Sequence, residues 1–389
     1  MKRDQLIKGL SVIARVVPDR STKPVLTCAL FEVQSGGGIT ITGQDVNVAM
    51  RWETTLTSEE SPNHAREVLP ETAAAEDNLA ERFVAPIKRI RDFLAHCDGT
   101  TVSFETVDSH VLFRSGTSEC RFATLDAREF PRLPSPALKE PIEISKASFL
   151  DALRNAPSLW ERGKPTSSGA HAGVWVAVRG DRIALRNAHS NATMFVQYEE
   201  TLDQECAESF AATLHQESAR ELLSVLSEIP AQKLSVRTAK SSTKFHVECG
   251  EYQFWGSLAS GKFPDMDTFF QPASCREYTV SPSQFVAISA RMAAVAPDGE
   301  NHHTVHLVAA ENGFEIRTTS EYGAFSEVFH ADPPPPAGLS LSLNYRLFLE
   351  ACKHMDDEEV CLLVESPLKP LAIADARKTF VVAPLISRS

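Results

Sequence analysis

The residues of this chain whose types could do chemistry include three neighbouring histidines. His302, His303 and His306 suggest a metal cluster, but the residues around the last of them, Val305–Val308, read as a strand. On a strand, His302 and His306 would share a face about 13 Å apart, which is too far for one ion. We therefore expect solvent-facing histidines near a loop rather than a metal site.

Other reactive side chains are scattered. The carboxylates Asp356–Glu359 lie in a charged turn, where solvation is the expected role. No C-x-x-C pair occurs, so the cysteines read as small buried residues of a reducing compartment: Cys28, Cys97, Cys120, Cys206, Cys249, Cys275, Cys352 and Cys361. Pro333–Pro336 predicts a rigid loop tip, with a proline-binding module of a partner as the alternative.

No group of residues supplies a nucleophile, a base and an oxyanion donor together. The chain lacks the G-x-x-x-x-G-K-[ST] phosphate loop and the G-x-S-x-G elbow. We therefore expect a protein that is not an enzyme and needs no cofactor. A metal-dependent hydrolase is the catalytic alternative, and it would require bound metal in the purified protein.

Length and composition are those of an ordinary globular protein. The 389 residues allow two to four domains, and 43% are hydrophobic while 23% are charged. No run of 18 apolar residues occurs, and Met1–Asp4 leads into an amphipathic segment instead of a signal-peptide core. These features predict a cytoplasmic protein.

A Phe-Pro pair recurs at about one third of the chain length. Phe130-Pro131 and Phe263-Pro264 lie 133 positions apart, each at the close of a similar stretch. Phe380–Leu385 is a degenerate third copy in the same register. Repetition at this period indicates one kind of domain used three times, so the function should come from the assembled array.

Each third of the chain is predicted to run helix, strands, helix, strands. In the first, apolar residues follow the helical period over residues 6–17, and a proline opens the helix Pro86–His96. The main strands of this third are Leu26–Val33 and Gly38–Arg51. The later thirds repeat the pattern, with helices Lys146–Arg162, His215–Glu228, Pro282–Val295 and Asn344–Met355, and strands Val174–Val178, Ile183–Arg186, His306–Ala309 and Phe314–Thr318. The predicted domains are 1–135, 142–270 and 276–389, with linkers at Pro134–Pro141 and Gln271–Ser274.

Charge is distributed unevenly over these elements. The six predicted helices carry a net charge of +6, which leaves −18 for the rest of a chain whose net charge is −12. Lys8 and Arg15 are two helical turns apart and share one face. A protein that presents its helices to a polyanion would have this distribution. The alternative is that helices simply tolerate Lys and Arg well.

Six short segments, in order along the chain, carry a resemblance to a known family. The chain resembles the beta sliding clamps of bacterial DNA polymerase III over essentially its whole length. The segments are Lys23–Leu26, Ile41–Asp45, Phe113–Gly116, Ala123–Leu133, Gly261–Asp265 and Phe380–Leu385.

The resemblance implies an α+β fold of three repeated DNA-clamp domains, with helices inside and antiparallel sheets outside a ring-shaped homodimer. It implies a processivity factor that encircles double-stranded DNA without sequence preference and has no chemistry of its own. The implied partners are DNA polymerase and repair proteins carrying clamp-binding peptides, a clamp loader and a second copy, with no membrane. The residues expected to face DNA are Lys8, Arg15, Lys23, Lys88, Arg89, Arg91, Arg154 and Arg291.

The family's partners insert a peptide between the second and third domains. The positions matching this groove are Pro264, Phe269, Val381, Val382, Pro384 and Leu385, which are apolar, and His171, His189, Asn191 and Ala192, which depart from the family pattern. A leucine that shapes the pocket is Ala192 here, and a glycine is His189. The resemblance therefore implies a wider and more polar groove.

Phe122 and Val295 match family positions at the dimer interface, whereas Cys120 and Ala294 replace larger residues. An acidic stretch, Glu59–Glu81, also lengthens the first domain. These departures suggest a diverged or secondary clamp. The alternative is a clamp-fold interaction protein that competes with a resident clamp for partners or subunits without acting as a processivity factor.

Overall fold

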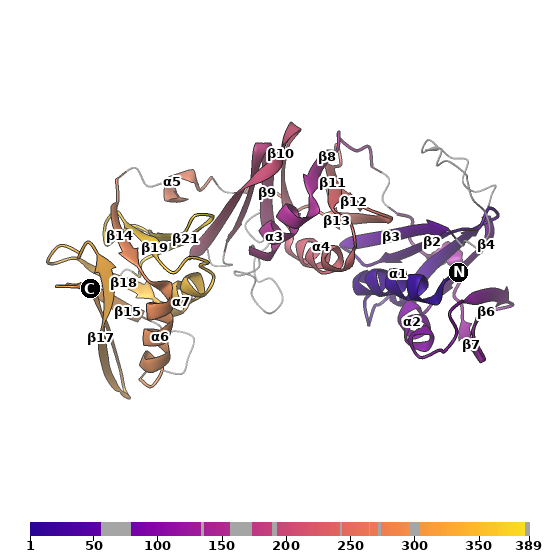
Figure 1. The fold of residues 1–389 in the computed structure, drawn as a ribbon, viewed down its shortest axis with the longest axis horizontal. Coiled ribbons are helices and arrows are strands. Elements are labelled where there is room, and N and C mark those ends of the chain that lie inside the picture. Colours follow the sequence, from indigo (N-terminus) through magenta and orange to yellow (C-terminus); the bar gives the residue numbers. More distant parts are fainter. Residues whose placement is uncertain are drawn as a thin grey trace. The chain divides into compact units, whose positions relative to one another are not determined.

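The computed structural model describes residues 1–55, 79–133, 136–155, 173–188, 193–241, 243–263, 265–270, 274–295 and 304–385. Within these ranges, no helix is both long and apolar enough to cross a membrane. The chain forms two compact units, drawn as a ribbon in Figure 1. Unit 1 comprises Met1–Leu150 and Glu217–Leu258, and unit 2 comprises Asp151–Gln216 and Ala259–Ser389.

Unit 1 is built on one eight-stranded antiparallel sheet with the order β4-β1-β2-β3-β13-β12-β11-β8. Its strands are β1 (Ala29–Gln34), β2 (Gly38–Gln44), β3 (Val48–Thr55), β4 (Leu79–Ala85), β8 (Ile142–Ser145), β11 (Lys233–Thr238), β12 (Lys244–Cys249) and β13 (Tyr252–Ser257). The sheet is continuous because β13 pairs with β3, which places Trp255 opposite Ala49. Segments about 200 positions apart in the sequence are therefore direct neighbours.

One face of this sheet is covered by α1 (Arg3–Val16) and α4 (Gln216–Glu228), with α2 (Ile87–Ala95) beside α1 (Figure 1). The helix α1 buries Leu6, Leu10 and Ile13. Gly9 allows its close approach, because a Cβ there would lie 2.2 Å from the ring of Trp52. A smaller sheet consists of β5 (Ser103–Val107), β6 (His110–Ser115) and β7 (Ser118–Ala123), with β7 at its edge.

Unit 2 contains a ten-stranded sheet with the order β18-β15-β16-β17-β14-β19-β20-β21-β10-β9. The strands are β9 (Gly173–Ala188), β10 (Met194–His215), β14 (Arg276–Val280), β15 (Thr304–Ala310), β16 (Gly313–Ser320), β17 (Gly323–Asp332), β18 (Ser340–Asn344), β19 (Val360–Val364), β20 (Leu371–Ala374) and β21 (Lys378–Val382). Its helices are α5 (Asp267–Phe270), α6 (Pro282–Met292) and α7 (Tyr345–Lys353), while α3 (Lys146–Asn155) spans the boundary of the two units.

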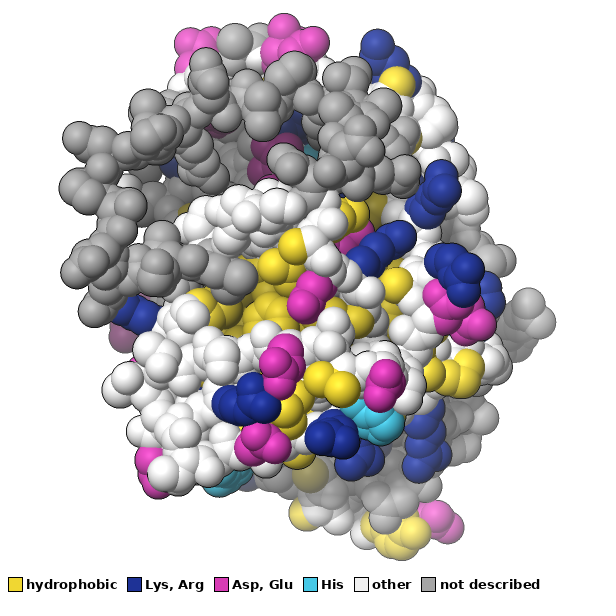
Figure 2. Space-filling model, turned by 90° about the vertical axis from the view of Figure 1, so that its right-hand side faces the viewer, with side chains coloured by type: hydrophobic (Ala, Val, Ile, Leu, Met, Phe, Trp, Pro, Cys, Tyr) yellow, Lys and Arg dark blue, Asp and Glu magenta, His cyan; other side chains and the backbone are white. Residues whose placement is uncertain are grey.

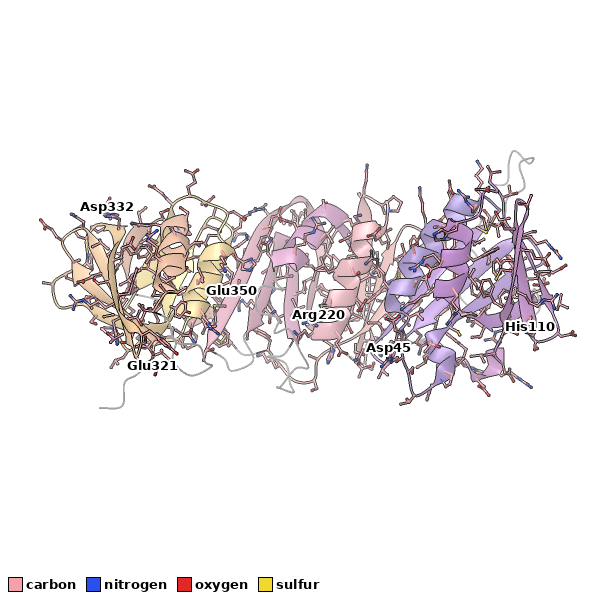
Figure 3. The ribbon with its side chains drawn as sticks, turned by 90° about the horizontal axis from the view of Figure 1, so that it is seen from below. Asp45, His110, Arg220, Glu321, Asp332 and Glu350 are labelled. Atoms are coloured by element: carbon pink, nitrogen blue, oxygen red, sulfur yellow. The ribbon has the colours of Figure 1, made fainter. Side chains whose placement is uncertain are left out.

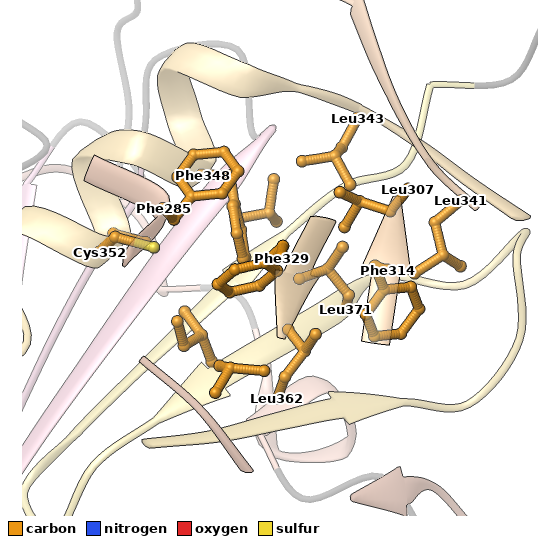
Figure 4. Packing of buried hydrophobic residues seen from close by; sticks show 14 of the residues in the cluster. Phe285, Leu307, Phe314, Phe329, Leu341, Leu343, Phe348, Cys352, Leu362 and Leu371 are labelled. Atoms are coloured by element: carbon orange, nitrogen blue, oxygen red, sulfur yellow. The ribbon is translucent and has the colours of Figure 1, made fainter. Parts of the chain in front are cut away.

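The core of unit 2 centres on three phenylalanines from different elements (Figure 4). Phe285 of α6 meets Phe348 of α7 edge to face, with ring centroids 4.6 Å apart. Phe329 of β17 lies 5.6 Å from Phe285 in the same arrangement. Aromatic rings attract each other in this edge-to-face arrangement, and the contacts hold both helices against the sheet.

The predicted helices Pro86–His96, His215–Glu228, Pro282–Val295 and Asn344–Met355 are confirmed within three residues at each end. The helix predicted at Lys146–Arg162 is described as far as Asn155, and its remainder lies outside the described residues.

Two strand boundaries were wrong. Gly38–Arg51 is not one strand but parts of β2 and β3, separated by a turn in which Asp45 N donates to Val48 O. Conversely, Val174–Val178 and Ile183–Arg186 belong to the single strand β9. Gly180 takes a left-handed conformation, with φ of +57°, near a register shift in the pairing of β9 with β10. The strand β9 continues through this irregularity instead of turning.

The three predicted domains do not appear as separate units, because each large sheet runs past a predicted boundary. The division into 1–135, 142–270 and 276–389 stays a prediction.

Candidate nucleic-acid and peptide interfaces

The exposed face of α1 carries two of the basic residues expected to contact DNA. Lys8 and Arg15 both lie opposite the buried face of this helix. The guanidinium of Arg15 donates to Ser224 Oγ at 2.9 Å and to Glu228 Oε1 at 2.7 Å, both on α4. Arg15 therefore links two helices of unit 1, whereas Lys8 makes no ion pair with any residue that the structure describes.

The other residues expected to face DNA also divide into cations that form an ion pair and cations that form none among the described residues. Lys88 Nζ lies 2.5 Å from Asp19 Oδ1 and lowers the pKa of that carboxyl group. Arg91 pairs with Asp92 at 2.6 Å, and Arg291 of α6 pairs with Glu327 of β17. The remaining candidates are exposed and make no ion pair within the described part of the chain: Lys23, Arg89 and Arg154.

Four of the eight predicted DNA-facing residues thus hold a carboxylate of the chain itself. Figure 3 labels Arg220 of α4 and Glu350 of α7, each on a helix of its unit. The paired side chains are all partly exposed, and ion pairs at the surface contribute only about 0–1 kcal/mol. A phosphate can therefore displace such a carboxylate at small cost, so these residues still suit contacts with a polyanion.

The predicted groove residues fall into three groups. His171, His189, Asn191, Ala192 and Pro264 lie outside the described residues. Phe269 and Leu385 are 41% and 40% exposed, and Pro384 is half-buried.

Val381 and Val382 lie on opposite faces of β21, because side chains alternate along a strand. Val382 is part of the core of unit 2, and its place in a groove stays a prediction. Val381 belongs to a separate apolar cluster with residues of the α5 region, which we call the α5 cluster: Phe263, Met266, Phe270, Ala372 and Val381, with Trp175, Phe195 and Leu363 packed against it.

Arg186 of β9, which the sequence did not single out, forms the polar side of the α5 cluster. Its Nη2 lies 2.6 Å from Asp267 Oδ1, and its guanidinium stacks 4.9 Å from the Trp175 ring and 5.3 Å from the Phe270 ring. Its Nε also donates to Gln197 Oε1 at 2.7 Å. In the sequence, the feature that could have indicated this site is Trp175, a large aromatic residue between the core positions of an alternating strand.

The predicted dimer residues lie on the edge strand β7 of unit 1 and in the turn that follows α6 of unit 2. Cys120 and Phe122 are on β7, the edge of the three-stranded sheet, and Phe122 packs edge to face on Phe93 and Phe113. Figure 2, which faces the end of Figure 1 where β6 and β7 lie, shows apolar side chains gathered among charged ones.

In unit 2, Val295 follows α6 and lies beside the start of β17. Its carbonyl accepts from Ser320 Oγ at 2.6 Å, and a Cβ on Gly323 would lie 3.6 Å from its Cγ1. Ala294, the other predicted interface residue of this unit, is exposed. These contacts place Val295 beside the turn of the β16–β17 hairpin.

The structure describes the surroundings of some of the reactive side chains. His306 of β15 is exposed and lies 2.9 Å from Ser342 Oγ, while His302 and His303 lie outside the described residues. Among the described residues, no group of three or more His, Cys, Asp or Glu side chains could hold a metal ion. Burial raises the pKa of Cys249 to about 11, so this thiol is protonated at neutral pH.

A family model, similar sequences and solved structures all match this chain to beta subunits of DNA polymerase III. Residues 1–134 match the family described as DNA polymerase III beta subunit, N-terminal domain. The beta sliding clamp of Staphylococcus aureus is 23% identical over 382 residues, which covers 96% of this chain and 94% of that protein. The beta sliding clamp of Bacillus subtilis is 24% identical over 384 residues, with the same coverage.

The fold agrees over the full length. The crystal structure of the Pseudomonas aeruginosa DNA polymerase sliding clamp matches with a TM-score of 0.82 at 17% identity, covering 100% of this chain and 99% of that one. Identity this low shows the fold alone. The chain is therefore similar to the beta sliding clamps of bacterial DNA polymerase III over nearly its whole length, both in sequence and in fold.

Proposed function

We propose that this chain is a DNA sliding clamp whose two copies close head to tail around duplex DNA and tether polymerases and repair proteins. The observation that carries the proposal is the relationship to beta sliding clamps over 96% of the chain. In this role the protein acts in the cytoplasm by topology and docking, without chemistry of its own, and each copy supplies three clamp domains.

The helix side of the units supports contact with DNA. Lys8 and Arg89 extend from α1 and α2, which pack against each other in unit 1. Phosphate contacts of this kind hold DNA without reading its sequence, and their strength falls with salt. A few exposed cations suit a ring that slides, because tight pairing with phosphates would hold the ring in place.

Two strand edges support ring closure. The strand β7 ends its sheet, and β17 pairs with β14 only through Ala331 and Asp332, so its earlier residues pair on one side, with β16. Unpaired strand edges favour pairing with another chain. A contact between β7 of one copy and β17 of the next is heterologous, and it closes into a ring of two if each copy spans half a turn.

The α5 cluster supports peptide docking. Phe269 and Leu385 are exposed apolar side chains of unit 2, and the cluster beside Phe269 is apolar with one charged wall at Arg186. Short partner peptides dock through a few hydrophobic anchors in such places. His171, His189, Asn191, Ala192 and Pro264 complete the proposed groove.

Retention on circular and linear DNA tests the topological mechanism. The protein is loaded by a clamp loader onto a nicked circular plasmid, which is then left intact or cut once. We expect retention on circles and loss from free ends. Equal retention on both substrates would refute encirclement and favour the competing interaction protein, as would a strictly monomeric chain in sedimentation at micromolar concentration.

A further inference from the structure

Unit 1 contains a cavity of about 650 Å³ on the sheet face that is turned away from α1 and α4. We call it the first-junction pocket, because the segment that follows the first Phe-Pro pair lines one side of it. Its lining includes Thr42, Arg51, Arg237, His246 and Trp255 on the sheet, and Phe130, Arg132, Leu138 and Lys139 on that segment.

Strand register builds the floor of the pocket from distant parts of the sequence. Arg237, His246 and Trp255 are directly opposite one another on β11, β12 and β13. In the adjoining row, Arg51 of β3 lies opposite Thr42 of β2 and Gln253 of β13. Residues opposite each other share a sheet face, so these side chains line one polar surface.

His246 is the most unusual residue of this floor. Its side chain is only 4% exposed, and neither ring nitrogen has a hydrogen-bond partner among the described residues. The nearest carboxylate oxygen, of Glu248, is 3.7 Å from Nδ1, too far for a hydrogen bond. A buried imidazole without a partner loses its solvation, so a ligand that accepts from it stabilises the site.

Other donors in the floor are unsatisfied as well. The Nε atoms of Arg51 and Arg237 and the hydroxyl of Thr42 have no partner within the described chain. Arg237 forms an ion pair with Glu248, with Nη2 2.8 Å from Oε1. Arg51 forms a longer one with Glu53, with Nη1 3.5 Å from Oε1. All of these groups can donate a hydrogen bond, so they suit a ligand rich in acceptors.

The charge of the lining has the sign that such a ligand needs. Five basic residues line the pocket, namely Arg51, Arg82, Arg132, Lys139 and Arg237, against two acidic ones, Glu32 and Glu140. Burial, together with Arg237 and Arg51, lowers the pKa of His246 to about 4, so its imidazole is neutral at neutral pH. This excess of positive charge contrasts with the net charge of −12 for the whole chain.

The roof of the pocket is fixed to the sheet at both ends. Phe130 packs with Leu30 and Val84 in an apolar cluster. At the other end, Lys139 N donates to Thr238 O at 2.9 Å, and Lys240 N donates to Ala137 O at 2.7 Å. These contacts hold the described residues of the roof against the sheet, so a ligand that binds there loses little ordering entropy at these positions.

The length of the floor decides what kind of ligand fits. From Thr42 on β2 to Arg237 on β11 the surface crosses four strand spacings, about 19 Å in all. One small oxyanion cannot reach both ends, whereas carboxylates spaced along a peptide can. The apolar side chains of Phe130 and Leu138 at the roof add a place for a hydrophobic residue.

We propose that the first-junction pocket binds an acidic peptide segment of a partner protein, with Arg51, Arg237 and His246 donating to its carboxylates. The equivalent region beyond the second Phe-Pro pair carries the apolar α5 cluster instead. One chain would therefore offer two docking sites of different chemistry, and binding at the first-junction pocket does not depend on DNA encirclement.

Titration of the full-length protein with a fluorescently labelled, capped hexaglutamate peptide tests the proposal. We expect saturable binding of one peptide per chain, weakened at least tenfold in the double variant Arg51→Gln/Arg237→Gln, because each lost charged donor removes a charge-assisted hydrogen bond. Arg132→Gln, which changes an exposed residue of the roof, should weaken binding severalfold. Arg317→Gln on β16, an exposed strand arginine of unit 2, is the matched control and should bind like the wild type.

Three results would overturn the proposal. The first is no saturable binding at low salt, and the second is an equal loss in Arg317→Gln. The third is inorganic pyrophosphate binding as tightly as the peptide, which would assign the pocket to small oxyanions. Circular dichroism checks folding, and Arg132→Gln decides the question if the double variant does not fold. Retention on circular DNA should be unchanged in every variant, which separates this site from clamp function.

Discussion

Arg15 of α1 lies 2.7 Å from the carboxylate of Glu228 on α4, so a residue expected to face DNA is held by an acid of the chain itself. The two side chains are 43% and 50% exposed, which keeps the pair weak. Glu228 therefore competes with phosphate for Arg15. The helix charge that the sequence shows is in part neutralised by such contacts in the folded chain.

Releasing Arg15 should strengthen DNA binding. In Glu228→Gln the guanidinium keeps its bond to Ser224 but loses its counter-charge, so we expect severalfold tighter binding to duplex DNA at low salt. The salt dependence of binding should steepen by about one phosphate contact. Fluorescence anisotropy over a range of salt concentrations measures both. Glu311→Gln, in an exposed turn of unit 2, is the control, and an equal gain there would point to net charge alone.

Reversing the unpaired cations should weaken DNA binding. Lys8→Glu combined with Arg89→Glu replaces two exposed cations that make no ion pair within the described residues. We expect at least a tenfold loss in affinity and a salt slope lower by about two, since each phosphate contact contributes about one unit. Lys369→Glu, in an exposed turn, changes the charge elsewhere. If it lowers affinity as much per charge, the helices are not the DNA surface.

Truncating an exposed anchor should impair peptide docking without unfolding the protein. Phe269 is 41% exposed, so Phe269→Ala removes contact area for a partner and little core packing. We expect about tenfold weaker binding of a short clamp-binding peptide, in line with the loss of an aromatic anchor. Isothermal titration calorimetry measures it, and Leu368→Ala, which is 69% exposed, is the control. Unchanged affinity in Phe269→Ala would remove this residue from the groove.

A charge on the β7 edge should open the ring. Cys120 is half-buried on this edge, so Cys120→Glu would place an unpaired carboxylate in the proposed contact. We expect the dimer to dissociate at concentrations at least tenfold higher than for the wild type. Ser103→Glu on β5, at the other edge of the same sheet, should leave the dimer intact. Analytical ultracentrifugation compares the two, and equal behaviour would place the interface elsewhere.

His246 should make unit 1 less stable in acid. The pKa of its imidazole is lowered from 6.5 to about 4 by burial, with Arg237 and Arg51 adding repulsion and Glu248 on the same strand as the nearest acid. Between these two values the unfolded chain binds a proton that the folded chain does not, so stability falls as the pH drops below about 6.5.

The expected loss is about 2 kcal/mol between pH 7 and pH 5. Urea unfolding of the wild type and of His246→Gln at several pH values measures it. The variant should lose this part of the pH dependence, whatever its absolute stability. Parallel curves for the two proteins would contradict the assignment.

Local patterns in the sequence predicted most helices but fewer strand boundaries. The helix at Tyr345–Lys353 follows from apolar spacing and from the cap that Asn344 provides by accepting from Arg346 N. The strand β9 was predicted as two, because a bulge at Gly180 and a turn look alike in sequence. Only pairing with β10 distinguishes them.

By itself the sequence determined the twofold recurrence of the Phe-Pro pair with its degenerate third copy, the excess of positive charge on the helices and the resemblance to the sliding clamps. These are local or summed properties of the chain, so they can be read from the sequence without knowledge of any tertiary contact. The tertiary structure decided which charges are paired and which valine of β21 lies in the core. It also brought Arg51 and His246, 195 positions apart, to one pocket, because the pairing of β3 with β13 is a long-range contact that no local pattern encodes.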